Sequence, residues 1–321
     1  MDKAPVIMFV YNRADNARET LRHLVANELA AETDLYVYAD GGKDEASWRM
    51  VNEVRSMLHE CKTEVERTHV LRSMTIVERE TNYYLERNVV EGIAEVLQQH
   101  EAVIVLEDDI CTSPYFLRYV NEALELYRDE PRVMHISGFT HLDLLADHPD
   151  WLPASDDTYF TRHMAGWGWA TWRDRWQKYF HHYQSRDEAL AELTADDISQ
   201  IEYGGAFPCL YHADRSPIPW DICWEIAIHR AAGLCLTPAH TMTRNIGLRQ
   251  GTHFSQLANS PLLMRYTYDR QPLNRAVRLT RRQPELDLRI EQAFAEAIRD
   301  WGIAYTPLGK VVRWIYKRFH R

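Results

Sequence analysis

The sequence predicts an α/β fold in which helices cover both faces of a mainly parallel central sheet. Apolar runs of strand length alternate with segments of helical periodicity through the first part of the chain. This alternation is typical of doubly wound sheets with right-handed crossovers. Residues 103–106, Val-Ile-Val-Leu, are apolar at every position, as in a strand that is buried on both faces.

The predicted elements follow one another in order. Residues 6–11 form an apolar run that predicts the first strand, and residues 12–27 carry apolar side chains at helical spacing. Ser113 followed by Pro114 is a typical helix start, and this helix should stop before Pro131. The same criteria predict strands at 35–39, 75–77, 103–106 and 133–137, and helices at 45–61 and 87–99.

The composition excludes several classes of protein. Among 321 residues, Lys and Arg total 37 against 47 for Asp and Glu, and the net charge of −10 argues against a general nucleic-acid binder. Five cysteines without a Cys-x-x-Cys pair argue against a zinc cluster and a disulfide framework. The N-terminus lacks the features of a signal peptide, and no stretch reaches the roughly 20 apolar residues of a membrane span. We therefore expect a cytoplasmic protein.

The strand at 103–106 ends without a spacer in an acidic triplet, Glu107, Asp108 and Asp109. The triplet should lie at the C-terminal edge of the sheet, where open α/β sheets bind ligands. Clustered carboxylates are unfavourable there without a cation or hydrogen-bond donors, and oxygen ligands favour Mg²⁺ or Mn²⁺. Because such an ion commonly holds a diphosphate, the triplet indicates a nucleotide-dependent transferase. The alternative is a solvated acidic turn. No glycine-rich dinucleotide or P-loop fingerprint is present.

A segment in the second half is unusually dense in glycine and tryptophan. One interpretation is a Trp-rich patch of the core. The other is a platform for a sugar, because aromatic faces pack on pyranose rings and glycines let the backbone approach a ligand. The candidate residues are Gly166, Trp167, Gly168 and Trp169.

Three polar residues near the end of this half are further candidates. Asp221 lies between Trp220 and Trp224 in the sequence, and an apolar setting would raise its pKa toward that of a general base. Arg244 and His253 belong to a polar, glycine-hinged segment that could close over phosphates. His253 is a candidate contact for metal or diphosphate, and the alternative is an ordinary polar residue.

Taken in order, these features resemble a known family. The chain is similar, over residues 5 to about 255, to glycosyltransferases of the GT-A fold, in particular N-acetylglucosaminyltransferase I and bacterial transferases that share its core. The triplet matches the Glu-Asp-Asp form of that family's Asp-x-Asp motif. The other matching features are Arg13 after the first strand, Asp40 at the end of the second, the Ser-Pro helix start, and Gly-x-Gly-Trp at 166–169 ahead of Trp220-Asp221.

The resemblance implies roles at the donor site. Arg13 and Asp40 would line the nucleotide base, and Asp40 would accept a hydrogen bond from a uracil ring. Glu107 would face hydroxyls of the donor sugar, and Asp108 the ribose or sugar. Asp109 would ligate Mn²⁺, or Mg²⁺, which bridges the diphosphate.

The resemblance also implies a catalytic base. Asp221 falls near the family's base, but this chain reads Trp-Asp-Ile-Cys-Trp where the animal enzyme has two adjacent acids before the second Trp. Glu225 is therefore a rival. The implied reaction is metal-dependent and inverting, because the base deprotonates an acceptor hydroxyl that attacks the anomeric carbon from the face opposite the nucleotide. The expected donor is a UDP-sugar, and the expected acceptor is a glycan or a lipid-linked molecule.

We expect a GT-A domain at 1–255, with a nucleotide-binding half at about 1–110 and an acceptor half at about 111–255, and a helical extension at 256–321. Residues 308–321 form a basic amphipathic pattern. This tail would either contact the inner face of a membrane or pack on the domain itself.

Two other functions are compatible with an acidic site on such a sheet. A sugar-phosphate nucleotidyltransferase usually carries a glycine-rich N-terminal loop with Arg and Lys, which is absent after Val10. A non-catalytic sugar-binding module would use the tryptophans, and it should ignore UDP and Mn²⁺.

Overall fold

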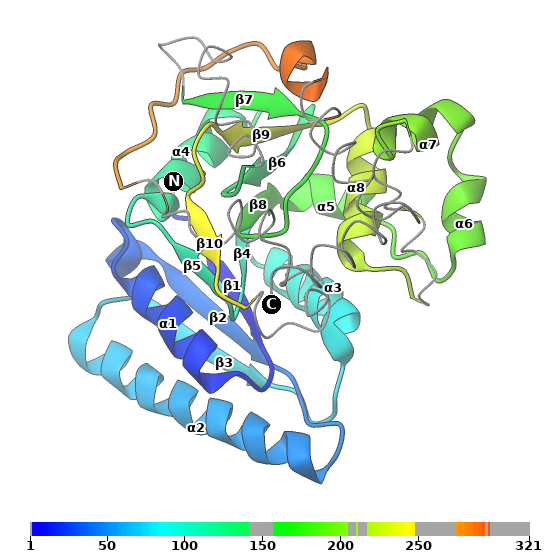
Figure 1. The fold of residues 1–321 in the computed structure, drawn as a ribbon. Coiled ribbons are helices and arrows are strands. Elements are labelled where there is room, and N and C mark those ends of the chain that lie inside the picture. Colours follow the sequence, from blue (N-terminus) through cyan, green and yellow to red (C-terminus); the bar gives the residue numbers. More distant parts are fainter. Residues whose placement is uncertain are drawn as a thin grey trace, which may run out of the picture.

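The computed structural model describes residues 2–140, 157–204, 210, 217–247, 272, 274–292 and 295. An eight-stranded sheet, in the order β3-β2-β1-β4-β8-β6-β9-β7, runs through the molecule, and β5 and β10 form a separate two-stranded sheet (Figure 1). The strands are β1 (Val6–Val10), β2 (Asp34–Ala39), β3 (Ser73–Glu78), β4 (Ala102–Glu107), β5 (Ile110–Thr112), β6 (Val133–Ser137), β7 (Thr158–Thr161), β8 (Trp169–Trp172), β9 (Leu234–Pro238) and β10 (Thr243–Asn245).

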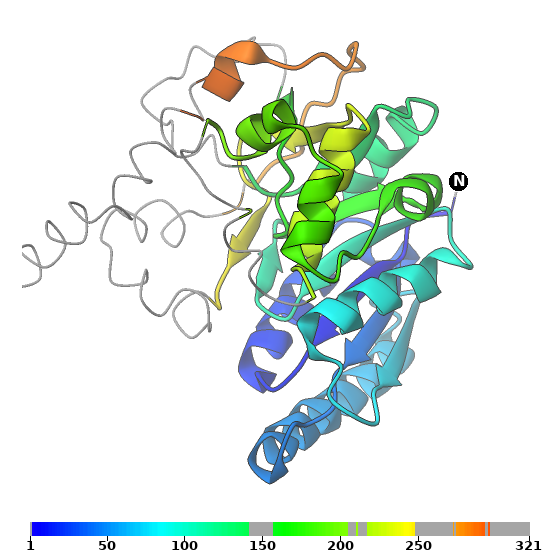
Figure 2. The ribbon, with the colours of Figure 1, turned by 90° about the vertical axis from the view of Figure 1, so that its right-hand side faces the viewer.

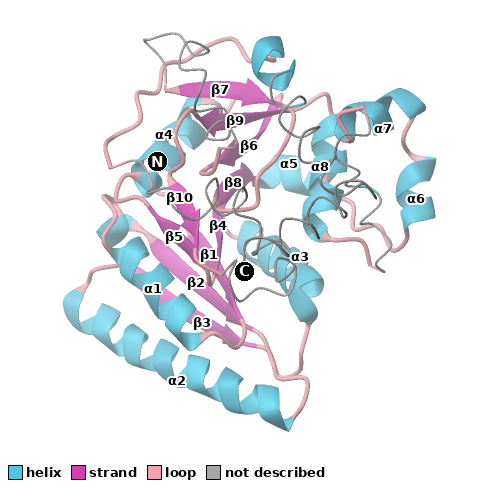
Figure 3. Ribbon diagram, viewed as in Figure 1, coloured by secondary structure: helices cyan, strands magenta, loops and turns pink. Residues whose placement is uncertain are grey.

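Helices cover both faces of the large sheet, which confirms the predicted α/β class (Figure 3). Buried apolar residues of α1, α2 and α4 form one core layer, and those of α3, α5 and α8 form the other. A smaller cluster joins α6 and α7 to α8, on the side that faces the viewer in Figure 2. The helices are α1 (Ala14–Val25), α2 (Glu45–Thr68), α3 (Tyr84–Leu97), α4 (Phe116–Leu126), α5 (Arg173–Tyr179), α6 (Arg186–Ala191), α7 (Ala195–Ile201) and α8 (Trp220–Arg230), with a short 3₁₀ turn at Ala30–Glu32.

The predicted strands and helices of the first 140 residues are present, with differences in helix bounds. Helix α3 runs from Tyr84 to Leu97 and not from 87 to 99. Helix α2 continues seven residues beyond position 61, because Val65 still packs in the core, and it ends where His69 adopts a left-handed conformation at φ 55°. Helix α4 begins at Phe116 and not at Ser113. The Ser113 hydroxyl instead accepts the Tyr115 N–H at 3.1 Å, so Ser113 and Pro114 form a turn ahead of the helix.

Strand β5 and the short strands of the second half were not predicted. Strand β8 lies antiparallel between β4 and β6, and β7 lies antiparallel to β9. Strands of three to five residues that are buried throughout carry no alternating pattern, and their pairing depends on partners far away in the sequence. Strands β1 to β4, in contrast, pair in parallel as expected.

The described part of the C-terminal segment packs against this second half. Arg275 and Arg278 both bind the Asp157 carboxylate, and Asp287 donates its backbone N–H to the carbonyl of Phe160 in β7. The predicted boundary at residue 255 and the tail at 308–321 lie outside the described residues. Within the described ranges, no helix is long and apolar enough to cross a membrane.

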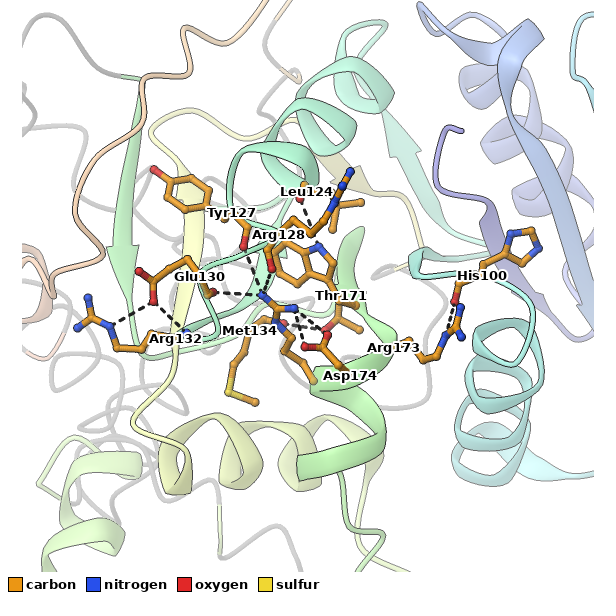
Figure 4. A network of polar contacts seen from close by, with 12 residues as sticks. His100, Leu124, Tyr127, Arg128, Glu130, Arg132, Met134, Thr171, Arg173 and Asp174 are labelled. Carbon is orange, nitrogen blue, oxygen red and sulfur yellow. Dashed lines mark hydrogen bonds and ion pairs between the residues drawn. The ribbon is translucent and has the colours of Figure 1, made fainter. Parts of the chain in front are cut away.

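A network of polar contacts joins the turn after α4, which carries Tyr127, Arg128 and Glu130, to Asp174 in α5 (Figure 4). Arg175, at the start of α5, has a side chain only 5% exposed. Its guanidinium donates to the carbonyls of Tyr127, Arg128 and Glu130, at 3.3, 2.6 and 3.2 Å, and to the Asp174 carboxylate. It therefore ties α5 to the turn that follows α4.

Arg175→Met should reduce the free energy of unfolding by about 3 kcal/mol, the scale for breaking a buried ionic network. The apolar side chain fills the space but cannot donate to the three carbonyls. Arg173→Met is the matched control, because Arg173 is partly exposed and its loss should cost about 1 kcal/mol or less. Chemical denaturation of the two variants measures the difference, and equal losses would contradict a special role for Arg175.

Candidate active site

The acidic triplet lies where β4 ends, at the C-terminal edge of the parallel strands. Strand β5 begins directly after the triplet and pairs with β10. The backbone N–H of Ile246 donates to the Asp109 carbonyl at 2.8 Å. Residues 243–247 are thereby held against the turn that carries the carboxylates.

Arg13 neutralises part of the negative charge of the acidic triplet. It follows β1, the parallel neighbour of β4, so it reaches the end of β4 from the side. Its guanidinium forms a two-point ion pair with Asp108, and its Nη1 lies 2.9 Å from Asp109 Oδ2. Burial opposes protonation of the guanidinium, but the charges of the two aspartates raise the pKa of Arg13 overall. Among the described residues, Arg13 contacts Asp108 and Asp109, and its contact with a nucleotide base, which the resemblance implies, stays a prediction.

The single positive charge of Arg13 does not balance the negative charges of the three carboxylates. Burial raises the pKa of Asp108 to about 7, although Arg13 opposes the shift. Burial also raises the pKa of Asp109. Burial, followed by the charges of Asp109 and Asp108, raises the pKa of Glu107 well above its usual value. A further cation at this edge would stabilise all three ionised carboxylates.

Asp109 has the features of a metal ligand. Its Oδ1 is buried and has no hydrogen-bond partner among the described residues. Gly247 packs so closely on the other oxygen that a Cβ at this position would lie 1.9 Å from Asp109 Oδ2 and 2.6 Å from Arg13 Nη1. A buried carboxylate oxygen without a donor fits a hard divalent cation such as Mn²⁺ or Mg²⁺.

Asp40 lies at the end of β2, on the same edge of the sheet, and is 5% exposed. Its Oδ1 accepts the backbone N–H groups of Gly41 and Tyr83, at 2.8 and 2.7 Å, and its Oδ2 accepts the Asn82 amide at 3.1 Å. Burial raises the pKa of Asp40, and these backbone bonds oppose the shift. Asp40 therefore anchors the loop that leads into α3.

Sequence reasoning missed the side chains around this loop. Lys43 lies over the rings of Tyr11 and Tyr84, at 5.5 and 4.6 Å from their centroids, and Tyr84 is 61% exposed. The only sequence signal was their position after predicted strands, because no motif marks them.

The sugar-platform interpretation is wrong for Trp169. This side chain is fully buried in β8, stacked between Trp220 at 5.4 Å and His135 at 5.1 Å between ring centroids. The core interpretation holds because β8 is inserted between two strands of the large sheet. Trp167 is only partly buried, and its ring meets Phe139 edge to face.

Gly168 allows this segment to pack closely on β10. Gly168 has φ +78°, and a Cβ there would lie 2.8 Å from Thr243 Cγ2. The Thr243 hydroxyl donates to the Trp167 carbonyl at 2.7 Å. The segment from Gly166 to Gly168 is thus brought to the strand that flanks the triplet.

The predicted apolar enclosure of Asp221 is also wrong. Trp220 and Trp224 are buried on one face of α8, whereas Asp221 occupies the neighbouring face of the first turn and is exposed. Its charge nevertheless contributes to the raised pKa of Glu107. Asp221 therefore lies on the same side of the molecule as the triplet.

The side chain of Glu225, the alternative candidate for the base, is held in place by its neighbours. Its Oε1 lies 2.5 Å from His163 Nδ1, and its Oε2 accepts the Met164 N–H at 2.9 Å. His163 stacks on Tyr203 at 3.8 Å, and its Nε2 lies 3.7 Å from Glu291. Only 13% of the Glu225 side chain is exposed.

Arg244 is in β10, opposite Cys111 of β5, and its Nε is buried without an acceptor among the described residues. It therefore lies beside the strand that leaves the triplet. The second predicted metal contact, His253, falls outside the described residues.

Comparison with known proteins matches residues 1–183 to the GNT-I family. A search of curated proteins found no match. Three solved structures are similar at low identity: S. aureus TarS (15% identity, 58% of this chain and 32% of that chain, TM-score 0.35), its 1–349 fragment (14%, 81% and 66%, 0.37), and mouse xyloside xylosyltransferase 1 in apo form (11%, 85% and 96%, 0.39). This chain thus spans about a third of the length of TarS.

Proposed function

Because this chain belongs to the GNT-I family, a family of glycosyltransferases, we propose that it transfers a sugar from a nucleoside-diphosphate donor to a glycan or a lipid-linked acceptor. The observation that carries this proposal is Asp109. Its Oδ1 is buried, has no hydrogen-bond partner among the described residues, and lies at the ligand-binding edge of a parallel sheet.

Asp109 would hold the divalent cation, Mn²⁺ or Mg²⁺, through Oδ1. When bound, this ion neutralises charge on the diphosphate of the departing nucleotide. Arg13 keeps the other oxygen of Asp109 in place and orients Asp108. His253 remains the expected second contact to the ion or the diphosphate.

The nucleotide base would lie near the ends of β1 and β2. Asp40 is fixed by three donors, and the remaining acceptor capacity of its carboxylate suits a uracil N–H. The exposed ring of Tyr84 offers a stacking surface for the base, and Lys43 beside it suits an anionic nucleotide. A UDP-sugar is therefore the favoured donor.

The donor sugar and diphosphate would extend past the triplet toward β10. Glu107 is partly exposed and would accept hydrogen bonds from sugar hydroxyls. Arg244 would bind a phosphate, since its Nε lacks an acceptor among the described residues. Gly166 and Gly168 present backbone, rather than side chains, on this side of the site.

Asp221 would remove the proton of the acceptor hydroxyl as the hydroxyl oxygen attacks the anomeric carbon. Its exposed position at the first turn of α8 is accessible to an acceptor that arrives from solvent. Glu225 is less suited, because both of its oxygens are already occupied by His163 and Met164. Attack opposite the leaving nucleotide would invert the anomeric configuration.

A ligand-dependent thermal shift tests this function. UDP with Mn²⁺, at about 100 times its Kd, should stabilise the folded chain by about 2.7 kcal/mol and raise Tm by roughly 5 °C, whereas either ligand alone should act weakly. A thermal shift with a nucleoside triphosphate and a sugar 1-phosphate, but not with UDP, would favour a nucleotidyltransferase. A shift with sugars alone would favour a sugar-binding module. Absence of a shift with any nucleoside diphosphate and Mn²⁺ would contradict the proposal.

A further inference from the structure

Three potential metal ligands of different chemistry meet between α1 and β5, the strand that follows the acidic turn. Glu19 and His23 are one turn apart on α1 and share a face, and Cys111 lies opposite them in β5. One ligand atom from each residue lies within 4.8 Å of the others. The cysteine is fully buried, whereas His23 and Glu19 have side chains 24% and 38% exposed. The cluster is therefore closed on the side of the sheet and open toward solvent.

His23 is oriented as a metal ligand would be. Its Nδ1 lies 3.0 Å from the carbonyl oxygen of Thr112. A carbonyl can only accept, so Nδ1 carries the proton and the neutral ring keeps its lone pair on Nε2. Metal-binding histidines typically donate their second ring nitrogen to a carbonyl or carboxylate in this way. Nε2 lies 3.4 Å from Glu19 Oε1.

The Arg22 guanidinium already contacts the lone pairs of Glu19 and His23. Arg22 Nη2 lies 2.6 Å from Glu19 Oε1 and 3.0 Å from His23 Nε2. The Arg22 side chain is 63% exposed, so it can turn into solvent without disturbing the core. Replacement of its guanidinium by a metal ion would preserve positive charge between the histidine and the carboxylate.

We propose that Glu19, His23 and Cys111 bind Zn²⁺, with water as the fourth ligand. The set of one sulfur, one nitrogen and one oxygen donor suits a borderline-soft tetrahedral ion, and it does not suit Mn²⁺ or Mg²⁺. On binding, the thiol releases its proton to solvent and Arg22 leaves the site. This site is separate from the carboxylate edge and does not depend on the function proposed above.

Zinc at this position would strengthen the contact between α1 and the acidic turn. The Thr20 hydroxyl of α1 already donates to the Asp108 carbonyl at 2.9 Å, and Asn27 donates to the Thr112 hydroxyl at 2.9 Å. A metal bridge from α1 to Cys111 would add a further connection. We therefore expect Zn²⁺ to raise Tm of the full chain in the absence of nucleotide.

Titration of the full chain with Co²⁺, followed by competition with Zn²⁺, tests the site. We expect one equivalent of Co²⁺ to give a sulfur-to-cobalt charge-transfer band in the near ultraviolet. Cys111→Ser should abolish the band, and His23→Gln should weaken Zn²⁺ affinity by roughly 100-fold or more, above the range for loss of an outer-shell partner. Arg22→Ala should tighten binding, because it removes the competing cation.

Cys61→Ser, in α2, is the control and should keep the band. Circular dichroism of each variant establishes that it is folded, and His23→Gln, at a partly exposed position, provides the test if Cys111→Ser does not fold. Asp109→Asn should also keep the band, since it alters only the carboxylate edge. The proposal is overturned if the parent chain shows no band, if His23→Gln keeps parental affinity, or if Asp109→Asn removes the band.

Discussion

Asp109→Asn should abolish Mn²⁺-dependent binding of UDP while the chain stays folded. The substitution is nearly isosteric, but it removes the charge of the only carboxylate in the triplet that has a buried oxygen without a partner among the described residues. Arg13 retains its ion pair with Asp108, so the turn should keep its conformation. Loss of an anionic metal ligand should weaken UDP affinity in Mn²⁺ by roughly 100-fold or more.

Isothermal titration with UDP, in the presence and absence of Mn²⁺, measures this effect. Asp15→Asn is the matched control, because Asp15 is a fully exposed carboxylate of α1 and its substitution should leave UDP affinity unchanged. Unchanged Mn²⁺-dependent affinity in Asp109→Asn would remove Asp109 from the metal site.

Asp221→Asn should slow sugar transfer by roughly 10²-fold or more and leave donor and metal affinity at parental values. A general base acts on the acceptor and contributes little to donor binding, so kcat should fall while the KM for donor stays nearly constant. Steady-state kinetics with saturating donor, together with UDP titration, separate these quantities.

Glu225→Gln is the paired variant. Because Glu225 holds His163 and the Met164 backbone, we expect its loss to lower stability more than kcat. If Glu225→Gln transfers sugar slowly while Asp221→Asn remains fully active, Glu225 is the base and Asp221 is not. If both variants transfer sugar at the parental rate, the base lies elsewhere in the chain.

Local patterns in the sequence were sufficient for the first half of the fold. The strands around Val6–Val10 and Ala102–Glu107 are long apolar runs, and the helices between them have a regular apolar stripe. Because parallel strands end at a common edge, the position of Glu107, Asp108 and Asp109 followed from the strand in front of them. The triplet is present at that edge.

The residues that contact these carboxylates could not be predicted from the sequence, because the contacts form only in the tertiary structure. Gly247 packs on Asp109 because β10 pairs with β5, strands separated by about 130 residues in the sequence, and no local pattern encodes such a pairing. For the same reason, the sequence could not reveal that Arg13 pairs with Asp108 and Asp109.

The sequence by itself determined the order of the early strands and helices and the chemistry of the acidic edge, because both follow from residues that are neighbours along the chain. Only the tertiary structure decided which side chains face solvent. It buried Trp169 between two strands, exposed Asp221 beside two buried tryptophans, and brought Cys111 to His23 across 88 positions. Burial and pairing of this kind depend on packing between distant elements, which residue type and spacing do not specify.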